Sequence, residues 1–395
     1  RSHFRSTDIW STGSLDVNQT SGWLGRYFDS NYPNFPADYP NANFPDPFAI
    51  SMGSEVSTTC QGLMGNFSHA VNDPFNTSNL LLTSVTNDGT YYGSHIEYIS
   101  TLINQTNEYG TSISASANAG NSLSTMYDPT NPLAVQLKYI AQMISGGLKT
   151  KVYIINIGGF DTHDSQVDQT NLAEGNHANL LKMISDAVAA FQNDLQLLGL
   201  EQRVAGMTFS EFGRQIASNG SFGTDHGDAA PIFLFGSCVN TGIIGPNPTI
   251  DNQINEQAGV PMQIDFRNIY ASILRDWFEA PEASIQALFE QNITYLDVLS
   301  GCSVGIAELE EQKLKPIIYP NPAPSNVTLR FIGKGEQYQI FIIDEQGKVL
   351  LKPFEGFLAA QQHDLPLETS KLPSGHYYAL ISATNSRELV AFQKI

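Results

Sequence analysis

The chain has 395 residues, 41% of them hydrophobic and 10% aromatic, so it is long enough for two folded parts and apolar enough to bury a core. Its 39 acidic residues outnumber its 20 basic ones, and the formal charge of −19 argues against nucleic acid or an anionic membrane as a partner. The sequence contains no apolar run of about 18 residues, so no membrane span is predicted.

The charge is unevenly distributed along the chain. From Pro316 onward, seven basic residues balance seven acidic ones, so the whole acidic excess lies in front of that point. This change predicts one domain over residues 1–310 and a second over residues 316–395. The three cysteines, Cys60, Cys238 and Cys302, allow at most one disulfide, whose pairing the sequence leaves open.

The first 150 residues divide into two kinds of sequence. Residues 1–60 are rich in Asn, Pro, Gly and aromatic residues, which predicts an ordered but loop-heavy segment with little regular structure. Residues 76–148 are predicted to be mostly helical, and "LAVQLKYIAQMISGG" ends on a glycine pair suited to a helix C-cap.

The central region has the order strand, helix, strand. "KVYIINI" (151–157) is rich in β-branched residues and predicts a strand buried on both faces, and "RVAGMTF" (203–209) and "APIFLFG" (230–236) predict two more. Between the first two of these segments, apolar residues at three- and four-residue steps predict one long helix: Leu180, Ile184, Val188, Phe191, Leu195 and Leu198. This order predicts an α/β fold with a mostly parallel sheet flanked by helices, followed by a further helix near 265–278.

The tail changes character after residue 316. Short alternating segments such as "NVTLRFIG", "QYQIFII" and "HYYALISA" are separated by turn signals such as "EQGK" and "PSG". This pattern predicts a small antiparallel β-sandwich.

Three polar clusters fall at or near the carboxyl edge of the predicted parallel sheet, where such sheets bind ligands. They are "GGFDTHD" (158–164), "SEFGR" (210–214) and "GTDHGDA" (223–229). In the first, Asp161 and His163 are candidate metal ligands, because carboxylate and imidazole suit zinc, iron or manganese. The alternative is a solvated loop in which Asp caps the next helix.

The other two clusters also have two interpretations each. Glu211 is a candidate ligand and Arg214 a candidate partner for it or for an anionic substrate, but a buried Glu211–Arg214 salt bridge is the alternative. Asp225 and His226 lie between glycines that permit close approach of a ligand, and Asp225 could instead orient His226 from behind.

A weaker pattern opens the chain. "RSHF" offers Ser2 as a nucleophile and His3 as a base or ligand, without any spacing that supports either role. The remaining histidines lie in no cluster and are interpreted as structural or exposed: His69, His95, His177, His363 and His376.

Residues 1 to about 295 resemble the bacterial domain-of-unknown-function family 1501. The resemblance rests on "RSHFRSTDIWSTG", "GWLGRYFD", "GGFDTHDSQ", "FSEFGRQIASNGSFGTDHGDAAPIFLFG" and "DFRNIYASILRDWF", in that order. That family is similar to the alkaline phosphatase superfamily, whose phosphatases and sulfatases use two metal ions and a Ser or Thr nucleophile. The resemblance therefore implies an alkaline-phosphatase-like fold and a divalent metal, whether zinc, manganese, iron or calcium.

Carried over residue by residue, the resemblance makes Asp161 and His163 ligands of one metal. Glu211 and Phe212 stand where the superfamily has an Asp-His pair, and His226 stands at its last histidine ligand. In another register, Asp225 and His226 are that pair, and Ser2 falls at the nucleophile. Family members also have an early strand with an aspartate upstream of "SHF", so we expect further residues to precede this sequence.

The tail resembles the type A C-terminal sorting domain of type IX secretion in the Bacteroidetes. "YPNPAPSNVTLRF", "IIDEQGKVL" and "LPSGHYYALI" carry the resemblance. It implies export to the cell surface or the medium, with the translocon as a partner.

These observations lead to three functional hypotheses. The first is an exported, metal-dependent hydrolase of phosphate or sulfate esters, in which Ser2 attacks and Arg214 neutralises the anion. The second is a non-catalytic cell-surface protein with a partner protein, on a degenerate hydrolase fold. The third is structural calcium binding by the acidic front part.

Overall fold

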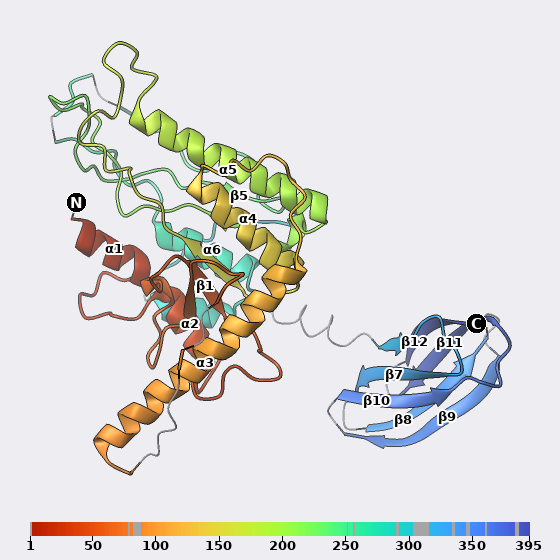
Figure 1. The fold of residues 1–395 in the computed structure, drawn as a ribbon. Coiled ribbons are helices and arrows are strands. Elements are labelled where there is room, and N and C mark those ends of the chain that lie inside the picture. The colour runs from red at the N-terminus through yellow and green to blue at the C-terminus, as the bar shows by residue number, and fades with distance from the viewer. Residues whose placement is uncertain are drawn as a thin grey trace. The chain divides into compact units, whose positions relative to one another are not determined.

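The computed structural model describes residues 2–77, 80–81, 88–250, 252–255, 257–289, 292–302, 316–333, 336–344, 348–359, 362–383 and 387–395. The chain forms two compact units (Figure 1), which we call unit 1 (residues 1–303) and unit 2 (residues 304–395). Each is described by itself.

A three-stranded parallel sheet lies at the centre of unit 1. Its strands are β1 (Ala49–Met52), β2 (Ser68–Val71) and β3 (Val152–Ile155), in the order β2-β1-β3. β1 is buried along its whole length. β3 was expected to be buried on both faces, but all four of its residues are only half-buried. The expectation of little regular structure before residue 60 is therefore wrong, because this segment supplies the central strand. It also supplies the helices α1 (His3–Thr12) and α2 (Trp23–Asn31).

The second and third predicted strands do not join the parallel sheet. β4 (Gly206–Met207) and β5 (Leu234–Phe235) form an antiparallel pair of their own. The Phe235 ring lies across Gly206, where a Cβ would come 2.1 Å from it. Glycine therefore allows a close antiparallel pairing that the apolar pattern of the two segments cannot distinguish from a parallel one.

Three long helices cover the parallel sheet, and within the described residues they confirm the mostly helical region predicted at 76–148 and the long helix predicted after 151–157. They are α3 (Tyr91–Ala119), α4 (Pro132–Ser145) and α5 (Asn176–Leu198). They share an apolar core with the sheet that includes Ile50, Ile113, Leu137, Ile140, Phe191 and Leu195. The ends of α3 and α4 meet at Gly120 and Gly146, where a Cβ on Gly120 would lie 1.8 Å from the Gln142 carbonyl oxygen.

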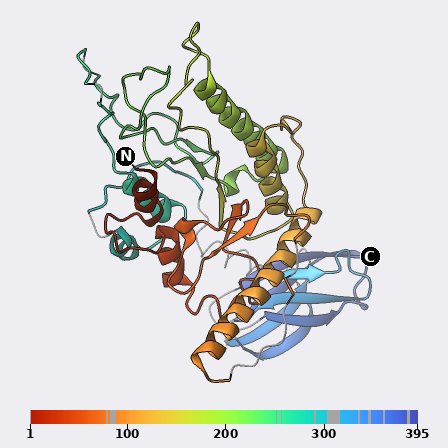
Figure 2. The same ribbon diagram turned by 60° about the vertical axis from the view of Figure 1, so that its left-hand side comes forward.

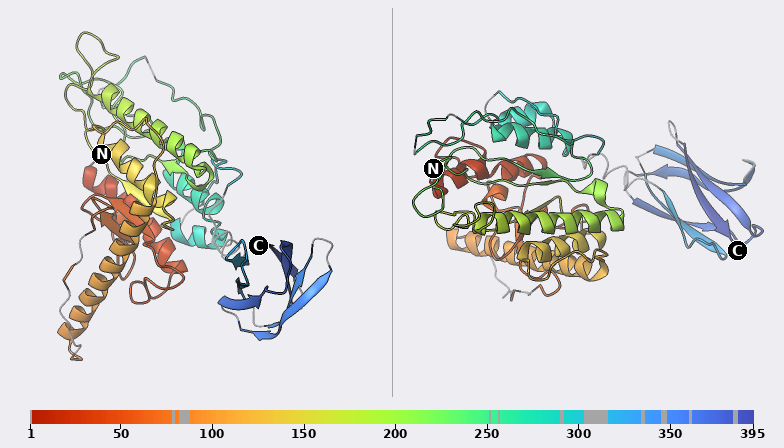
Figure 3. Two further views of the ribbon diagram at one scale, coloured as in Figure 1. Left: turned by 45° about the vertical axis from the view of Figure 1, so that its right-hand side comes forward. Right: turned by 90° about the horizontal axis from the view of Figure 1, so that it is seen from above.

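The other helices lie on the opposite side of unit 1 from α3–α5, as Figures 2 and 3 show. This group contains α1, α2, α6 (Phe266–Asp276) and α7 (Glu282–Phe289), and α6 confirms the helix predicted near 265–278. Cys238 and Cys302 form a disulfide, and Cys60 is free and buried. None of the helices within the described ranges is long and apolar enough to cross a membrane.

Unit 2 is the predicted antiparallel sandwich. One sheet has the order β10-β7-β6, formed by β6 (Ile317–Tyr319), β7 (Asn326–Ile332) and β10 (Gln362–Glu368). The other has the order β12-β11-β8-β9, formed by β8 (Glu336–Ile343), β9 (Val349–Leu358), β11 (Gly375–Ser382) and β12 (Arg387–Lys394). The sheets share a core that includes Leu329, Phe331, Ile340, Ile342, Ala379 and Phe392.

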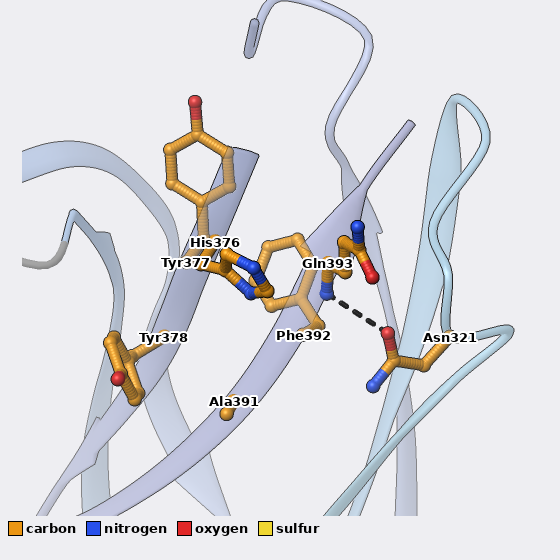
Figure 4. A pocket seen from close by; sticks show the side chains of 7 residues that line it. All are labelled: Asn321, His376, Tyr377, Tyr378, Ala391, Phe392 and Gln393. Carbon is orange, nitrogen blue, oxygen red and sulfur yellow. Dashed lines mark hydrogen bonds between the residues drawn. The ribbon is translucent and has the colours of Figure 1, made fainter. Parts of the chain in front are cut away.

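A hollow of about 360 Å³ lies beside β11 and β12 (Figure 4). Its lining includes His376, Tyr378, Gln393 and Asn321, whose side-chain oxygen accepts a 2.9 Å hydrogen bond from the Gln393 backbone. The lining contains a single histidine and no carboxylate. Among the residues that the structure describes, a group of histidine and aspartate side chains with metal-ligand spacing lies in unit 1.

Candidate metal centre

The polar loop after β3 packs directly against the two later clusters. Arg214 and His226 form an antiparallel bridge, and the Gln215 N–H donates to the Asp225 carbonyl at 2.9 Å, so these two segments lie side by side. A Cβ on Gly223 would lie 2.2 Å from the His163 carbonyl oxygen. Glycine at this position therefore allows the third cluster to contact the backbone of "GGFDTHD".

Three ligand-type atoms form a tight triangle at this junction. Asp161 Oδ1 lies 2.9 Å from His226 Nε2 and 3.1 Å from His163 Nε2, and the two Nε2 atoms are 2.9 Å apart. Atoms bound about 2.1 Å from one ion, at right angles to one another, would lie about 3.0 Å apart. The triangle therefore has edges that suit a coordinated cation.

His3 reaches the same point from the first turn of α1. Its Nε2 lies 3.3 Å from Asp161 Oδ2, and His3, Asp161 and His226 offer ligand atoms that all lie within 4.8 Å of one another. We refer to His3, Asp161, His163 and His226 as the histidine–aspartate cluster. In the sequence, His3 was only one possible base or ligand beside Ser2, and no spacing signal linked it to residues more than 150 positions away.

Glu211 and Asp225 lie behind imidazoles of this cluster. Glu211 Oε1 is 2.8 Å from His3 Nδ1, and Asp225 Oδ1 is 2.9 Å from His163 Nδ1. An ionised carboxylate only accepts hydrogen bonds, so each Nδ1 carries a proton, and each Nε2 is the ring atom directed at Asp161. The sequence suggests that Asp225 orients His226. In the structure, Asp225 instead accepts a hydrogen bond from the imidazole of His163.

The electrostatics of these two pairs agree with their geometry. The hydrogen bond from His163 lowers the pKa of Asp225. Burial raises the pKa of Glu211, but hydrogen bonds from its own backbone N–H, His3 and Ser210 outweigh burial and lower it overall. The hydrogen bond to Glu211 raises the pKa of His3 more than burial lowers it.

Arg214 is engaged with Asp161 and the backbone. Its Nη1 donates to Asp161 Oδ1 at 2.6 Å, its Nη2 to the Thr224 carbonyl, and its Nε to Thr224 Oγ1 at 3.2 Å. The considered Glu211–Arg214 salt bridge is replaced by this ion pair with Asp161. Burial raises the pKa of Asp161, but the bonds from Arg214 and His226 outweigh it and lower the pKa to about 2.

Three of the four side chains of the cluster are open to solvent. The side chains of His3, Asp161 and His163 are 45%, 43% and 46% exposed, so a substrate attached to a larger molecule could reach them. Ser2, the candidate nucleophile, is exposed at the N-cap of α1, directly before His3. Phe212, at the position where the resemblance expects a histidine ligand, stacks on the ring of His226.

Comparison with known families gives two matches. The model described as "Protein of unknown function (DUF1501)" matches residues 121–289. The model described as "Secretion system C-terminal sorting domain" matches residues 317–394. Residues 317–394 are a type IX sorting domain.

The sorting domain establishes that the protein is exported, to the cell surface or to the medium. It also implies that the type IX system handles the chain. The DUF1501 match contains every member of the histidine–aspartate cluster except His3, and its description names no activity. No curated protein matches the chain.

Proposed function

We propose that unit 1 binds a divalent transition-metal ion at the histidine–aspartate cluster and hydrolyses phosphate or sulfate esters outside the cell. The observation that carries this proposal is the 2.9–3.1 Å triangle of Asp161 Oδ1, His163 Nε2 and His226 Nε2. Three imidazoles and one carboxylate suit zinc, manganese or iron. Calcium prefers an all-oxygen shell, so calcium is not the ion proposed for this cluster.

A bound ion at such a site polarises an ester oxygen and acidifies water. The protein's part is to hold Asp161 ionised, through Arg214, and to fix the His3 and His163 tautomers through Glu211 and Asp225. Three N–H groups of Arg214 already donate within the protein. We therefore assign Arg214 to positioning Asp161 and keep only Ser2, exposed beside His3, as the candidate nucleophile.

We also propose that unit 1 has an alkaline-phosphatase-like fold. The support is local: "GGFDTHD" follows the carboxyl end of β3 in a parallel sheet, which is where ligand-binding loops lie in such folds. The proposed fold and the proposed metal site are independent of each other, because one fold can serve many activities.

The activity is tested on protein stripped with a chelator and reloaded with zinc, manganese or iron, using p-nitrophenyl phosphate and p-nitrophenyl sulfate. We expect metal-dependent hydrolysis that falls at least about 100-fold in Asp161→Asn and Ser2→Ala. Asp164→Asn is the matched control, because Asp164 lies in the same motif but, among the described residues, its side chain accepts a hydrogen bond from Ser165 and from no member of the cluster. Metal-loaded wild-type protein that hydrolyses neither ester would contradict the proposal.

One observation favours a second candidate, a non-catalytic surface protein. Asp161 Oδ1 already accepts from Arg214 at 2.6 Å and faces His226 at 2.9 Å, so the cluster can also be a closed hydrogen-bond network without an ion. In that case the ordered open face would serve a partner protein. The protein would then retain no metal on purification, and Asp161→Asn would weaken partner binding instead of turnover.

A further inference from the structure

Phe212 touches two members of the histidine–aspartate cluster with its ring. Its centroid lies 4.2 Å from that of His226, with the planes 29° apart, and 4.9 Å from that of His3, with the planes 52° apart. His3 comes from α1 and His226 from the segment before β5, so Phe212 lies between imidazoles supplied by two distant parts of the chain.

We infer that Phe212 is a positioning residue of the candidate metal centre, which keeps the Nε2 edges of His3 and His226 directed at Asp161. This inference rests on the proposed metal site. Phe212 stands at the position where the resemblance expects a histidine ligand. Its ring then supports metal binding indirectly, because it orders the imidazoles of His3 and His226.

The chemistry of imidazole makes such packing useful. A histidine coordinates through a lone pair in the plane of its ring, so the ring face is free to contact another side chain. Phenylalanine offers no donor or acceptor and leaves both Nε2 atoms available. Aromatic pairs prefer offset or tilted arrangements at centroid distances of about 4.5–7 Å, close to the distances from Phe212 to these two rings.

The backbone around Phe212 is fixed, so its ring has a defined position. The N–H of Gly213 donates to the Asp228 carbonyl at 2.8 Å. A Cβ on Gly213 would lie 2.0 Å from the Ala229 carbonyl oxygen, so the chain after Phe212 lies directly on the segment after His226. Phe212 and His226 are thereby held on neighbouring, hydrogen-bonded segments.

Zinc affinity, measured by competition with a chromophoric chelator, tests this role on the full chain. Loss of an orienting contact behind a ligand typically weakens binding about 10- to 100-fold, and we expect that loss in Phe212→Leu. Phe212→Tyr keeps the ring and should stay within about threefold of the wild type. Phe233→Leu is the control, because Phe233 is 58% exposed and precedes β5. Equal affinity of Phe212→Leu and Phe233→Leu would overturn the inference.

A second measurement does not depend on a bound metal. In the metal-free protein, histidine ring ¹H–¹⁵N spectra should show averaged signals of His3 and His226 in Phe212→Leu. The signals of His69, which lies in β2 and away from the cluster, should stay unchanged. Wild-type protein that binds none of zinc, manganese and iron would refute the proposed function, while unchanged His3 and His226 signals in Phe212→Leu would refute the positioning role on their own.

Discussion

The Nε2 atoms of His163 and His226 lie 2.9 Å apart, and both face Asp161 Oδ1. Asp225 accepts from His163 Nδ1, so Nδ1 carries a proton and Nε2 is the ring atom that faces His226. Such a contact is stable when a proton or a metal ion lies between the two nitrogens. The proposed function assigns a metal ion to this point, because nitrogen and oxygen atoms of several side chains are directed at it.

The tautomer argument predicts the effect of Asp225→Asn. An amide can donate as well as accept, so His163 loses the group that keeps the proton on Nδ1, and zinc affinity should fall about 10- to 100-fold. Thermal stability should change little, because solvent screens exposed polar pairs and they contribute little to the free energy of unfolding. Asp164→Asn provides the control in both measurements, and identical zinc affinity of the two variants would refute the assigned role of Asp225.

A pH dependence of stability is expected from His69, in β2 and away from the cluster. Burial lowers its pKa below the ordinary value of 6.5, so the folded state favours the neutral ring. The stability that this provides is complete above pH 6.5 and is lost as the pH falls through 6.5 toward the folded pKa. Urea denaturation at pH 7.5 and 5.5 should show a smaller loss in His69→Gln than in the wild type. An equal loss in both proteins would exclude His69 as the source.

The disulfide should contribute strongly to the stability of unit 1. Cys238 and Cys302 are 64 residues apart in the sequence, and closing a loop of that length stabilises the folded state by about 4 kcal/mol in the chain-entropy estimate. Cys238→Ser with Cys302→Ser should lower the free energy of unfolding by roughly this amount. A change below about 1 kcal/mol would show that the bond is not formed in the mature protein.

Cys60 should behave as an inert thiol in the folded protein. Its side chain is buried, and burial raises the pKa of the thiol to about 12, so almost no thiolate exists at neutral pH. An alkylating reagent should therefore label no cysteine in the native protein and one per chain after unfolding without reductant. Rapid labelling of native protein at Cys60 would contradict this burial.

Removal of residues 316–395 should block export without unfolding the rest of the chain. The sorting domain has its own apolar core, and the core of the parallel sheet lies wholly within unit 1. Cell fractionation should find the truncated protein inside the cell, with an unchanged unfolding transition of unit 1. Normal export of the truncated protein would show that the export signal lies elsewhere in the chain.

Local patterns in the sequence predicted the helices and the tail. The stripe along α5 and the alternation in β8 and β11 are set by which side chains face the core, and each is visible within one segment. β1 was missed because it has only four residues, "AISM", and its partners are β2 and β3, which lie farther along the chain. The prediction that β4 and β5 join a parallel sheet is wrong, because the apolar content of a segment does not determine whether it pairs parallel or antiparallel.

In the candidate site, too, some features are visible within one segment of the sequence and others depend on how distant segments pack. Asp161, His163 and His226 were selected from the sequence because glycine-flanked polar clusters at strand ends are typical of ligand sites. Their proximity, and the positions of Glu211 and Asp225 behind imidazoles, depend on how three loops pack. His3 joins them only because α1 packs beside the segment 209–212, through Phe212 and the stacking of Trp10 near Phe209.

Metal content tests the central claim most directly. The exported protein, purified without chelator and analysed by elemental mass spectrometry, should carry about one zinc, manganese or iron ion per chain. Asp161→Asn, which removes the negative charge beside the Nε2 atoms of His163 and His226, should carry less than about a tenth of that amount. Wild-type protein that retains no such ion, even after incubation with each metal, would contradict the account.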